Sequence, residues 1–531
     1  MGFKVALLII FVAATIYIGF YSRKKAQSVE GFVLGGRKIG PWMSAFAYGT
    51  SYFSAVVFIG YAGQFGWKFG LAAFWAGVGN VLIGSLLAWF VLGRRTRIMT
   101  NHLDAKTMPE FFGKRFDSNA LRIASALIIF VFLIPYTASV YNGLSRLFGM
   151  AFGLPYEACI IAMAVVTCIY VIWGGYTATA LNDTVQGIIM LVSIIAVILC
   201  VLNGQGGFIE ALKNLAEVSD PSIPNGGVPG VFACMFGPDP LNLLGVVVLT
   251  SLGTWGLPQM VQKFYAIRDD AAIKRGTIIS TIFAVIVSGG SYLMGGFGRL
   301  YGAADPGLAA QTGRTLIETG ANGKPAFDSI VPAMLKDALP EVLIGIVVVL
   351  VLSASMSTLS SLVLTSSSTL TIDLIKPYVK GLTEKKQVLI MKALIAVFLT
   401  ISVVIALNPN AYITTLMSIS WGALAGAFLA PYMYGLFSKK ITRPAVWASF
   451  ITGVGLTTAH MFVFSLGFFP ELTKAAASLP LNLASPINAG AAAMLAGLII
   501  VPVVSAFTRV KDPDRVQEIF DGCKKERQTN R

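Results

Sequence analysis

The chain has 531 residues, of which 56% are hydrophobic and only 12% are charged. A composition this apolar excludes an ordinary soluble protein and predicts a polytopic membrane protein. The net charge of +15 would suit a nucleic-acid partner, but such proteins gather their basic residues on one soluble face, whereas here they alternate between loops. Five scattered Cys and two His show no metal-ligand spacing. We therefore expect no nucleic acid, disulfide or zinc.

Apolar windows long enough to cross a bilayer as a helix, about 20 residues each, occur about thirteen times. They cover residues 4–21, 43–64, 71–93, 121–148, 156–174, 183–203, 241–262, 276–300, 340–372, 388–407, 411–437, 443–466 and 487–507. This pattern predicts an all-α integral membrane protein. The first helix runs into the basic sequence SRKK without a small-residue cleavage site, so we expect a retained span rather than a signal peptide.

Basic residues accumulate on one side of the predicted membrane topology. With the N-terminus outside, the inward-facing segments carry 31 of the 40 Lys and Arg, and these segments are residues 23–38, 94–122, 263–275, 376–392, 439–443 and 509–531. This bias predicts a cytoplasmic C-terminus. We expect a multi-pass protein of the cell (plasma) membrane, in a bacterial inner membrane. Lys263 counts here as a loop charge, and Asp373 is expected to be an ordinary charge near the inner boundary.

Two of the predicted helices are interrupted. The second contains YGTSYFS (48–54), loosened by Gly49, and the seventh contains TSLGTWGLPQ (250–259), which two glycines and Pro258 must open. Because the breaks lie five helices apart, two sets of five helices would have opposite orientations. This is the inverted-repeat plan of secondary transporters, whose unwound backbone binds substrate and ions. A pair of kinks without a ligand is the alternative.

A run of hydroxyl side chains lies inside the apolar span 340–372, namely Ser353, Ser355, Ser357, Thr358, Ser360 and Ser361. On a helix, positions i, i+3, i+4 and i+7 from Ala354 share one face, so three of these hydroxyls line one stripe. They could simply bond back to carbonyls of their own helix. Together with freed carbonyls they could also coordinate an alkali cation without a permanent buried charge.

Asp183 is a second polar feature, because acidic residues near spans are rare and mostly functional. It precedes the apolar run TVQGIIMLVSIIAVILC, so it could instead be a helix N-cap. Neither interpretation is preferred on this feature alone, and proton coupling through Asp183 also stays open. The fifth, sixth and ninth predicted helices offer no Lys or Arg placed to pair with it.

Four motifs occur in order on these helices: FVLGGRKIG (32–40), WGGYTATALNDTVQG (173–187), GLPQ (256–259) and ASMSTLSS (354–361). With them the chain resembles the sodium/solute symporter family, which contains bacterial proline, pantothenate and sialic acid symporters and the sodium/glucose transporters. The resemblance implies 13 helices on a leucine-transporter-type 5+5 inverted repeat with additional flanking helices. The implied divisions are a first helix and loop (1–40), repeat 1 (41–203), an outward loop (204–240), repeat 2 (241–437), two further helices (438–507) and a basic tail (508–531).

The resemblance also implies that sodium is the coupling ion. The principal sodium site would take backbone oxygens from the first break and oxygens from the hydroxyl stripe, at Thr50, Phe53, Ala354, Ser357 and Thr358. A second site, as in the sialic acid symporters, would share Ser357 and add Asp183, Ser360 and Ser361.

The solute is expected near the two breaks, at Tyr52, Ser54, Thr254, Trp255 and Gln259. The proline symporters resemble the chain at Ser54 and Pro258, but they carry Asp in place of Tyr52, and Trp and Tyr in place of Thr250 and Thr254. No Arg occurs in ALIIFVFLIPYTASVYNG to bind a sialic acid carboxylate. We therefore expect a pantothenate-like or other small carboxylate as the solute.

The predicted function is sodium-coupled import of a small organic solute by alternating access, and a sodium/proline or other amino-acid symporter is the alternative. A proton-coupled transporter, a channel and a membrane sensor are further rivals. A channel should show a selectivity loop such as TVGYG, and a sensor should carry a soluble domain. The sequence shows neither. No enzymatic activity and no obligate protein partner are expected, so the partners are the solute and membrane lipid.

Overall fold

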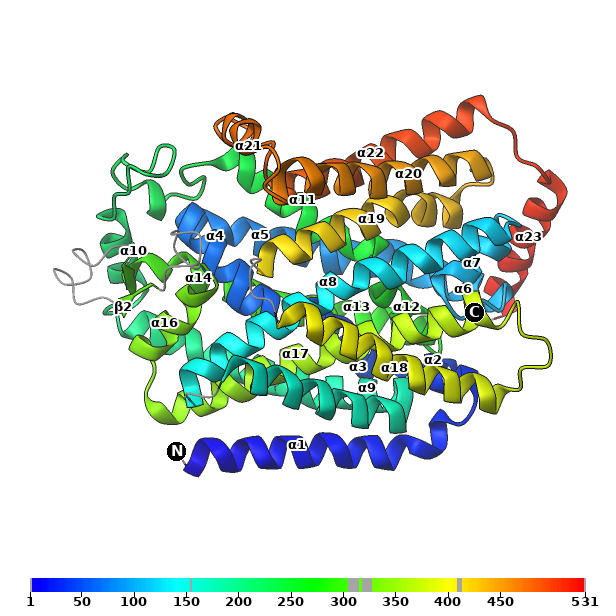
Figure 1. Cartoon of the computed structure of the whole chain (residues 1–531), viewed down its shortest axis with the longest axis horizontal. Coiled ribbons are helices and arrows are strands. Elements are labelled where there is room, and N and C mark those ends of the chain that lie inside the picture. The colour runs from blue at the N-terminus through cyan, green and yellow to red at the C-terminus, as the bar shows by residue number, and fades with distance from the viewer. Residues whose placement is uncertain (1, 153–154, 304–314, 318–326, 408–412, 530–531) are drawn as a thin grey trace.

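The structure is a computed structural model that describes residues 2–152, 155–303, 315–317, 327–407 and 413–529. It is a bundle of roughly parallel and antiparallel helices (Figure 1). The N-terminus and the C-terminus lie at opposite ends of the bundle (Figure 1). We name these ends after two short helices, the α10 end (α10, Phe208–Ala216) and the α23 end (α23, Pro513–Thr529).

The body of the bundle is made of helices that mostly coincide with the apolar windows of the sequence. They are α1 (Gly2–Ser22), α3 (Pro41–Tyr52), α4 (Ala62–Phe69), α5 (Phe74–Gly79), α6 (Arg94–His102), α8 (Asn119–Phe152), α9 (Tyr156–Asn203), α11 (Pro240–Gly256), α12 (Pro258–Ala266), α13 (Asp270–Ala284), α14 (Gly290–Gly296), α17 (Glu341–Thr369), α18 (Glu384–Ala406), α19 (Ile413–Phe437), α20 (Arg443–His460) and α22 (Pro486–Phe507). Short π-helical segments join α4 to the break before it, α5 to α6 and α13 to α14.

Shorter elements cover the ends of the bundle. They are α2 (Val29–Leu34), α7 (Met108–Arg115), α16 (Ile330–Ala338), α21 (Pro470–Ala477) and a parallel pair of two-residue strands, β1 (Gly302–Ala303) and β2 (Thr315–Leu316). α2 and α7 lie at the α23 end, and α16 lies at the α10 end (Figure 1).

Among the described residues, ten helices are long and apolar enough to cross a membrane, or eleven with the bent pair α11–α12. Two of these, Val56–His102 and Tyr156–Asn203, have 47 and 48 residues. Straight helices of that length would measure about 70 Å, more than twice the bilayer core of about 30 Å. Each contains a glycine at positive φ, Gly70 (φ +59°) and Gly175 (φ +52°), that divides it. Counting the halves separately gives the thirteen segments expected from the sequence.

The first interrupted helix breaks after α3. Phe53 leaves the helical region (φ −101°, ψ 78°), and the chain becomes helical again at Ala55. Gly49 does not loosen the helix as expected, because it lies within α3. A Cβ atom there would come within 2.4 Å of the Phe283 ring, so this glycine permits close packing of α13.

The second interrupted helix breaks at Leu257, where α11 and α12 meet at a 46° bend. Pro258 begins α12, since its missing N–H and fixed φ suit the first helical position. Gly253 serves a close approach, because a Cβ atom there would lie 2.3 Å from the Trp421 ring of α19. Both breaks therefore occur where the sequence predicted them, within one or two turns.

α17 and α19 form the interior of the bundle and are buried along most of their length. α17 packs against α9, α8, α3 and α12, so its hydroxyl stripe faces the two interrupted helices. α1 and α22 lie on opposite sides of the bundle (Figure 1).

Asp373 corrects one expectation at the α23 end. It is fully buried rather than interfacial, because α17 continues as a π-helical segment to Ile375 that places Asp373 against α8 and against Thr107, the residue before α7. Its Oδ1 lies 2.6 Å from Arg122 Nε, and Thr107 Oγ1 donates to its Oδ2 at 2.6 Å. This ion pair ties the end of α17 to the start of α8.

Candidate functional site

The centre of the site is the contact between the end of α3 and the hydroxyl stripe of α17. Ser357 Oγ donates to the carbonyl of Thr50 at 3.0 Å and lies 3.1 Å from the carbonyl of Ala354. Thr358 Oγ1 lies 3.1 Å from the Ala354 carbonyl and 3.4 Å from that of Thr50. Four of the five residues predicted for the principal sodium site therefore place oxygen atoms within hydrogen-bond distance of one another.

All four of these residues are fully buried. Each hydroxyl has two lone pairs as well as its proton, so a rotation of the hydroxyl lets it accept a cation while the carbonyls keep their place. Several neutral oxygens in one small volume suit a hard monovalent cation. The same hydroxyls satisfy local carbonyls without an ion, so the geometry is compatible with both states.

Phe53, the fifth predicted residue, lies at the break itself. Its ring stacks on that of Tyr52, with centroids 4.2 Å apart. A small cavity between α3, α9, α14 and α17 is lined by Phe53, Ser54 and Ala354, together with Met190. The break therefore borders open space beside the oxygen cluster.

The second predicted ion set lies one turn further along α17. Ser360 Oγ and Ser361 Oγ donate to the Ser357 carbonyl at 2.9 and 3.1 Å, and Ser361 Oγ is also 2.8 Å from Ser51 Oγ. Both serines are buried. A hydrogen-bonded chain of oxygens therefore runs from the end of α3 along α17.

Asp183 is not an N-cap, because α9 resumes its helix directly after Gly175 and Asp183 is therefore well inside it. Its side chain is fully buried, and neither carboxylate oxygen accepts a hydrogen bond from the described residues. Its ion-pair partner is Lys263 of α12, whose Nζ lies 3.7 Å from Asp183 Oδ2.

Lys263 was expected in an inward-facing loop, and this expectation is wrong. It lies in α12 with its side chain only 3% exposed, and its Nζ donates to Ser361 Oγ at 2.8 Å. The cation that pairs with Asp183 thus comes from α12, which continues to Ala266, beyond residue 262 where the seventh helix was predicted to end.

The residues predicted for the solute divide into two groups. Tyr52 Oη donates to the Thr250 carbonyl at 2.7 Å, while Thr254 Oγ1 and Trp255 Nε1 bond to the carbonyls of Gly84 and Ile83 at 3.1 and 3.0 Å. These side chains therefore tie α3 to α11 and tie α11 to residues 83–84. Their polar atoms are already used within the protein.

The second group of residues predicted for the solute consists of Ser54 and Gln259. Ser54 Oγ accepts the backbone N–H of Val56 at 3.2 Å, which caps the helix after the first break. Gln259, in the first turn of α12, is 1% exposed, and neither of its amide atoms has a hydrogen-bond partner among the described residues. A buried amide without partners is costly. Gln259 is therefore the residue, among those predicted for the solute, whose polar atoms are free to bind a solute.

Comparison with known proteins identifies the family of this chain. The model of the sodium:solute symporter family matches residues 32–453. The chain belongs to the sodium:solute symporter family. This is a family of transporters rather than enzymes, and the chain is a multi-pass, sodium-coupled solute symporter.

Several relatives are transporters of proline. The chain is 29% identical to the sodium/proline symporter of Salmonella typhimurium (strain LT2) over 453 residues, which cover 84% of this chain and 85% of the relative. It is 29% identical to the osmoregulated proline transporter OpuE of Bacillus subtilis (84% and 86% covered) and 30% identical to the sodium/proline symporter of Staphylococcus aureus strain JH9 (84% and 83% covered).

A solved structure establishes the fold. A Na+-coupled sialic acid symporter in a substrate-bound, outward-open state aligns with a TM-score of 0.69 at 16% identity, covering 95% of this chain and 98% of that one. The symporter therefore has the leucine-transporter-type fold expected from the sequence.

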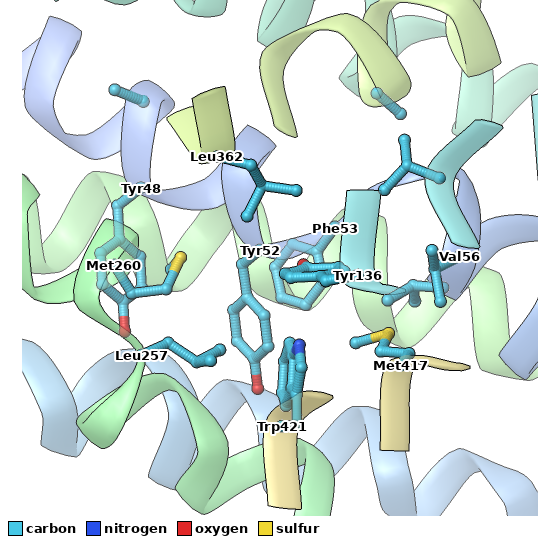
Figure 2. Close-up of a cluster of buried hydrophobic side chains, with 14 of the residues drawn as sticks. Tyr48, Tyr52, Phe53, Val56, Tyr136, Leu257, Met260, Leu362, Met417 and Trp421 are labelled. Carbon is cyan, nitrogen blue, oxygen red and sulfur yellow. The ribbon is translucent and has the colours of Figure 1, made fainter. Parts of the chain in front are cut away.

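The structure adds two aromatic residues that the sequence did not single out. Trp421 of α19 stacks on Tyr52 with centroids 6.3 Å apart, and Tyr136 of α8 meets Trp421 edge-on at 5.9 Å (Figure 2). The Trp421 indole N–H and the Tyr136 hydroxyl have no hydrogen-bond partner among the described residues. In sequence, neither differs from the other aromatic residues of apolar spans, so only their position beside the breaks reveals them.

Replacing both Ser357 and Thr358 by Ala should raise the sodium concentration for half-maximal uptake tenfold or more. Each factor of ten corresponds to about 1.4 kcal/mol of binding free energy. The change removes two hydroxyl oxygens that face the Thr50 carbonyl. Uptake at a series of sodium concentrations measures the effect.

Ser355→Ala is the matched control, because Ser355 lies on the same buried helix but bonds only to the Val351 carbonyl of its own preceding turn. It should leave sodium activation unchanged. Sodium activation that is the same in the wild type and in a correctly inserted double variant would contradict the assignment.

Proposed function

We propose that this symporter couples sodium entry to the import of proline or a closely related small amino acid. The observation that supports sodium coupling at this site is the contact of Ser357 Oγ with the Thr50 carbonyl at the first break. A bound sodium would hold α3 to α17 through Thr50, Phe53, Ala354, Ser357 and Thr358. Sodium entry toward a negative interior supplies about 2.3 kcal/mol per charge per 100 mV.

The choice of solute rests on the relatives, several of which are sodium/proline symporters. They favour the amino-acid alternative over the pantothenate-like carboxylate expected from the sequence. The aromatic cluster of Tyr52, Phe53, Tyr136 and Trp421 offers apolar faces for a compact ring (Figure 2). Gln259 offers an amide at the start of α12, where the helix dipole favours a carboxylate.

The differences from the proline symporters at Tyr52, Thr250 and Thr254 lie together in the structure. Tyr52 Oη donates to the Thr250 carbonyl, and Thr254 Oγ1 donates to the Gly84 carbonyl, which also accepts from Tyr48 Oη of α3. These three differences change side chains near the predicted solute position and leave the predicted sodium ligands unchanged. We therefore include close relatives of proline among the solutes.

We also propose that the α23 end is cytoplasmic. The basic loops and the basic tail gather at that end, as expected from the positive-inside bias. Alternating access would then expose the two breaks first to the α10 end and afterwards to the α23 end. The release of sodium into a low-sodium cytoplasm would release the solute with it.

Uptake of radiolabelled proline into proteoliposomes tests the proposed function. A sodium gradient directed inward should drive accumulation, an inside-negative potential should increase it, and a potassium gradient should not replace sodium. Excess unlabelled proline analogues should compete, whereas pantothenate should not. Uptake that is independent of sodium would contradict the coupling, and competition by pantothenate alone would contradict the solute.

Gln259→Leu should raise the KM for the solute about tenfold or more, since a hydrogen bond to a charged group contributes about 1.5–3 kcal/mol. It should not lower the melting temperature, because the amide it removes has no protein partner. Uptake kinetics and thermal unfolding of the purified protein measure the two effects.

The control on the same helix is Gln262→Leu. The amide of Gln262 donates to the Val33 carbonyl and accepts from Thr365 Oγ1 at 2.7 Å. This variant should therefore lower the melting temperature and leave KM near the wild-type value. If Gln259→Leu instead behaves as this control does, Gln259 is structural.

A further inference from the structure

Two oppositely charged side chains face each other deep in the bundle. Asp183 of α9 is fully buried, Lys263 of α12 is 3% exposed, and their closest charged atoms are 3.7 Å apart. Among the described residues, neither side chain has another ion-pair partner. A buried carboxylate in a membrane protein needs one positive charge nearby, and here a lysine supplies it.

The lysine lies where a second sodium ion would bind. Ser361, one of the residues predicted for that ion, accepts a hydrogen bond from Lys263 Nζ at 2.8 Å. The same hydroxyl is 3.1 Å from the Ser357 carbonyl and 2.8 Å from Ser51 Oγ. The ammonium thus touches the oxygen chain one turn beyond Ser357 and balances the charge of Asp183.

We propose that Lys263 is the resident cation of the second ion position, so that this symporter moves one sodium ion per solute. The inference rests on the proposed sodium coupling. A sodium ion bound by Asp183, Ser360 and Ser361 would stand within a few ångströms of the ammonium. Two positive charges would then share one carboxylate in a poorly solvated interior, where charges of like sign repel strongly. The second sodium set therefore stays empty of sodium while Lys263 is in place.

Lys263 also belongs to the helix that carries the predicted solute residue Gln259. Lys263 follows Gln259 by four residues, so both side chains lie on one face of the same short helix. α12 thereby connects the predicted solute position to α17 and α9. A mobile sodium ion at the same place would bind α9 and α17, but it would not be covalently part of α12, the helix that carries Gln259.

The test is the ratio of sodium to solute, measured from reversal potentials in proteoliposomes that contain the wild type or a variant. The wild type should give a ratio of one. Lys263→Gln removes the resident charge and leaves Asp183 free for an ion, so it should give a ratio near two and a higher Hill coefficient for sodium. Lys263→Arg keeps the charge and should stay at one.

A second measurement covers the case in which Lys263→Gln is unstable without its ion pair. Its melting temperature should rise more steeply with sodium than that of the wild type, because sodium takes the place of the ammonium. Lys263→Gln combined with Asp183→Asn carries neither charge, and it should lose this additional sodium dependence and return to a ratio of one.

A wild-type ratio of two would overturn the inference, and so would a transporting Lys263→Gln variant that stays at one. Failure of sodium to stabilise that variant beyond the wild type would also overturn it. These results differ from a failure of the proposed function, which would appear as wild-type uptake without any dependence on sodium.

Discussion

The meeting of an interrupted helix with a hydroxyl-rich helix is the constraint on which the rest of the structure depends. Where α3 ends at Phe53, backbone carbonyls lose their partners in the next turn, and the membrane interior offers no water to replace them. α17 meets this need with Ser357 and Thr358, which bond to the Thr50 carbonyl. α17 therefore satisfies the Thr50 carbonyl at the end of α3.

The same contact explains why α17 lies at the centre of the bundle. A helix that presents hydroxyls to two broken helices must be enclosed by both, and α17 packs against α3 and α12 as well as α9. Its neighbours then carry the remaining polar groups to one place. Ser51 and Lys263 both reach Ser361, and Asp183 pairs with Lys263. The polar interior is one connected network rather than several separate sites.

Much of this could be predicted from the sequence, because membrane helices follow simple patterns of hydrophobicity and the second break is marked by Pro258. The stripe at Ser357 and Thr358 was evident for the same reason, since hydroxyls at helical spacing share a face. The partner of Asp183 was not evident. Lys263 follows a break in another helix and adjoins the basic loop that ends with Arg275, so its sequence context resembles a loop charge.

Other features depend on tertiary packing that a single sequence does not record. Gly49 was interpreted as a loosened helix, but its role is to admit the Phe283 ring. Asp373 was interpreted as an interfacial charge, but α8 supplies Arg122 to pair with it. Trp421 and Tyr136 have no mark in the sequence that separates them from core aromatics. In each case the deciding partner lies more than 200 residues away along the chain.

Hydrogen–deuterium exchange with and without sodium tests the central claim most directly. If sodium joins the end of α3 to α17, replacing potassium by sodium should slow exchange in peptides that cover residues 46–58 and 350–365. Peptides from α20 should not change, since α20 packs mainly against α19 and α22 rather than against α3 and α17. Equal exchange of the first two segments in sodium and in potassium would contradict the account.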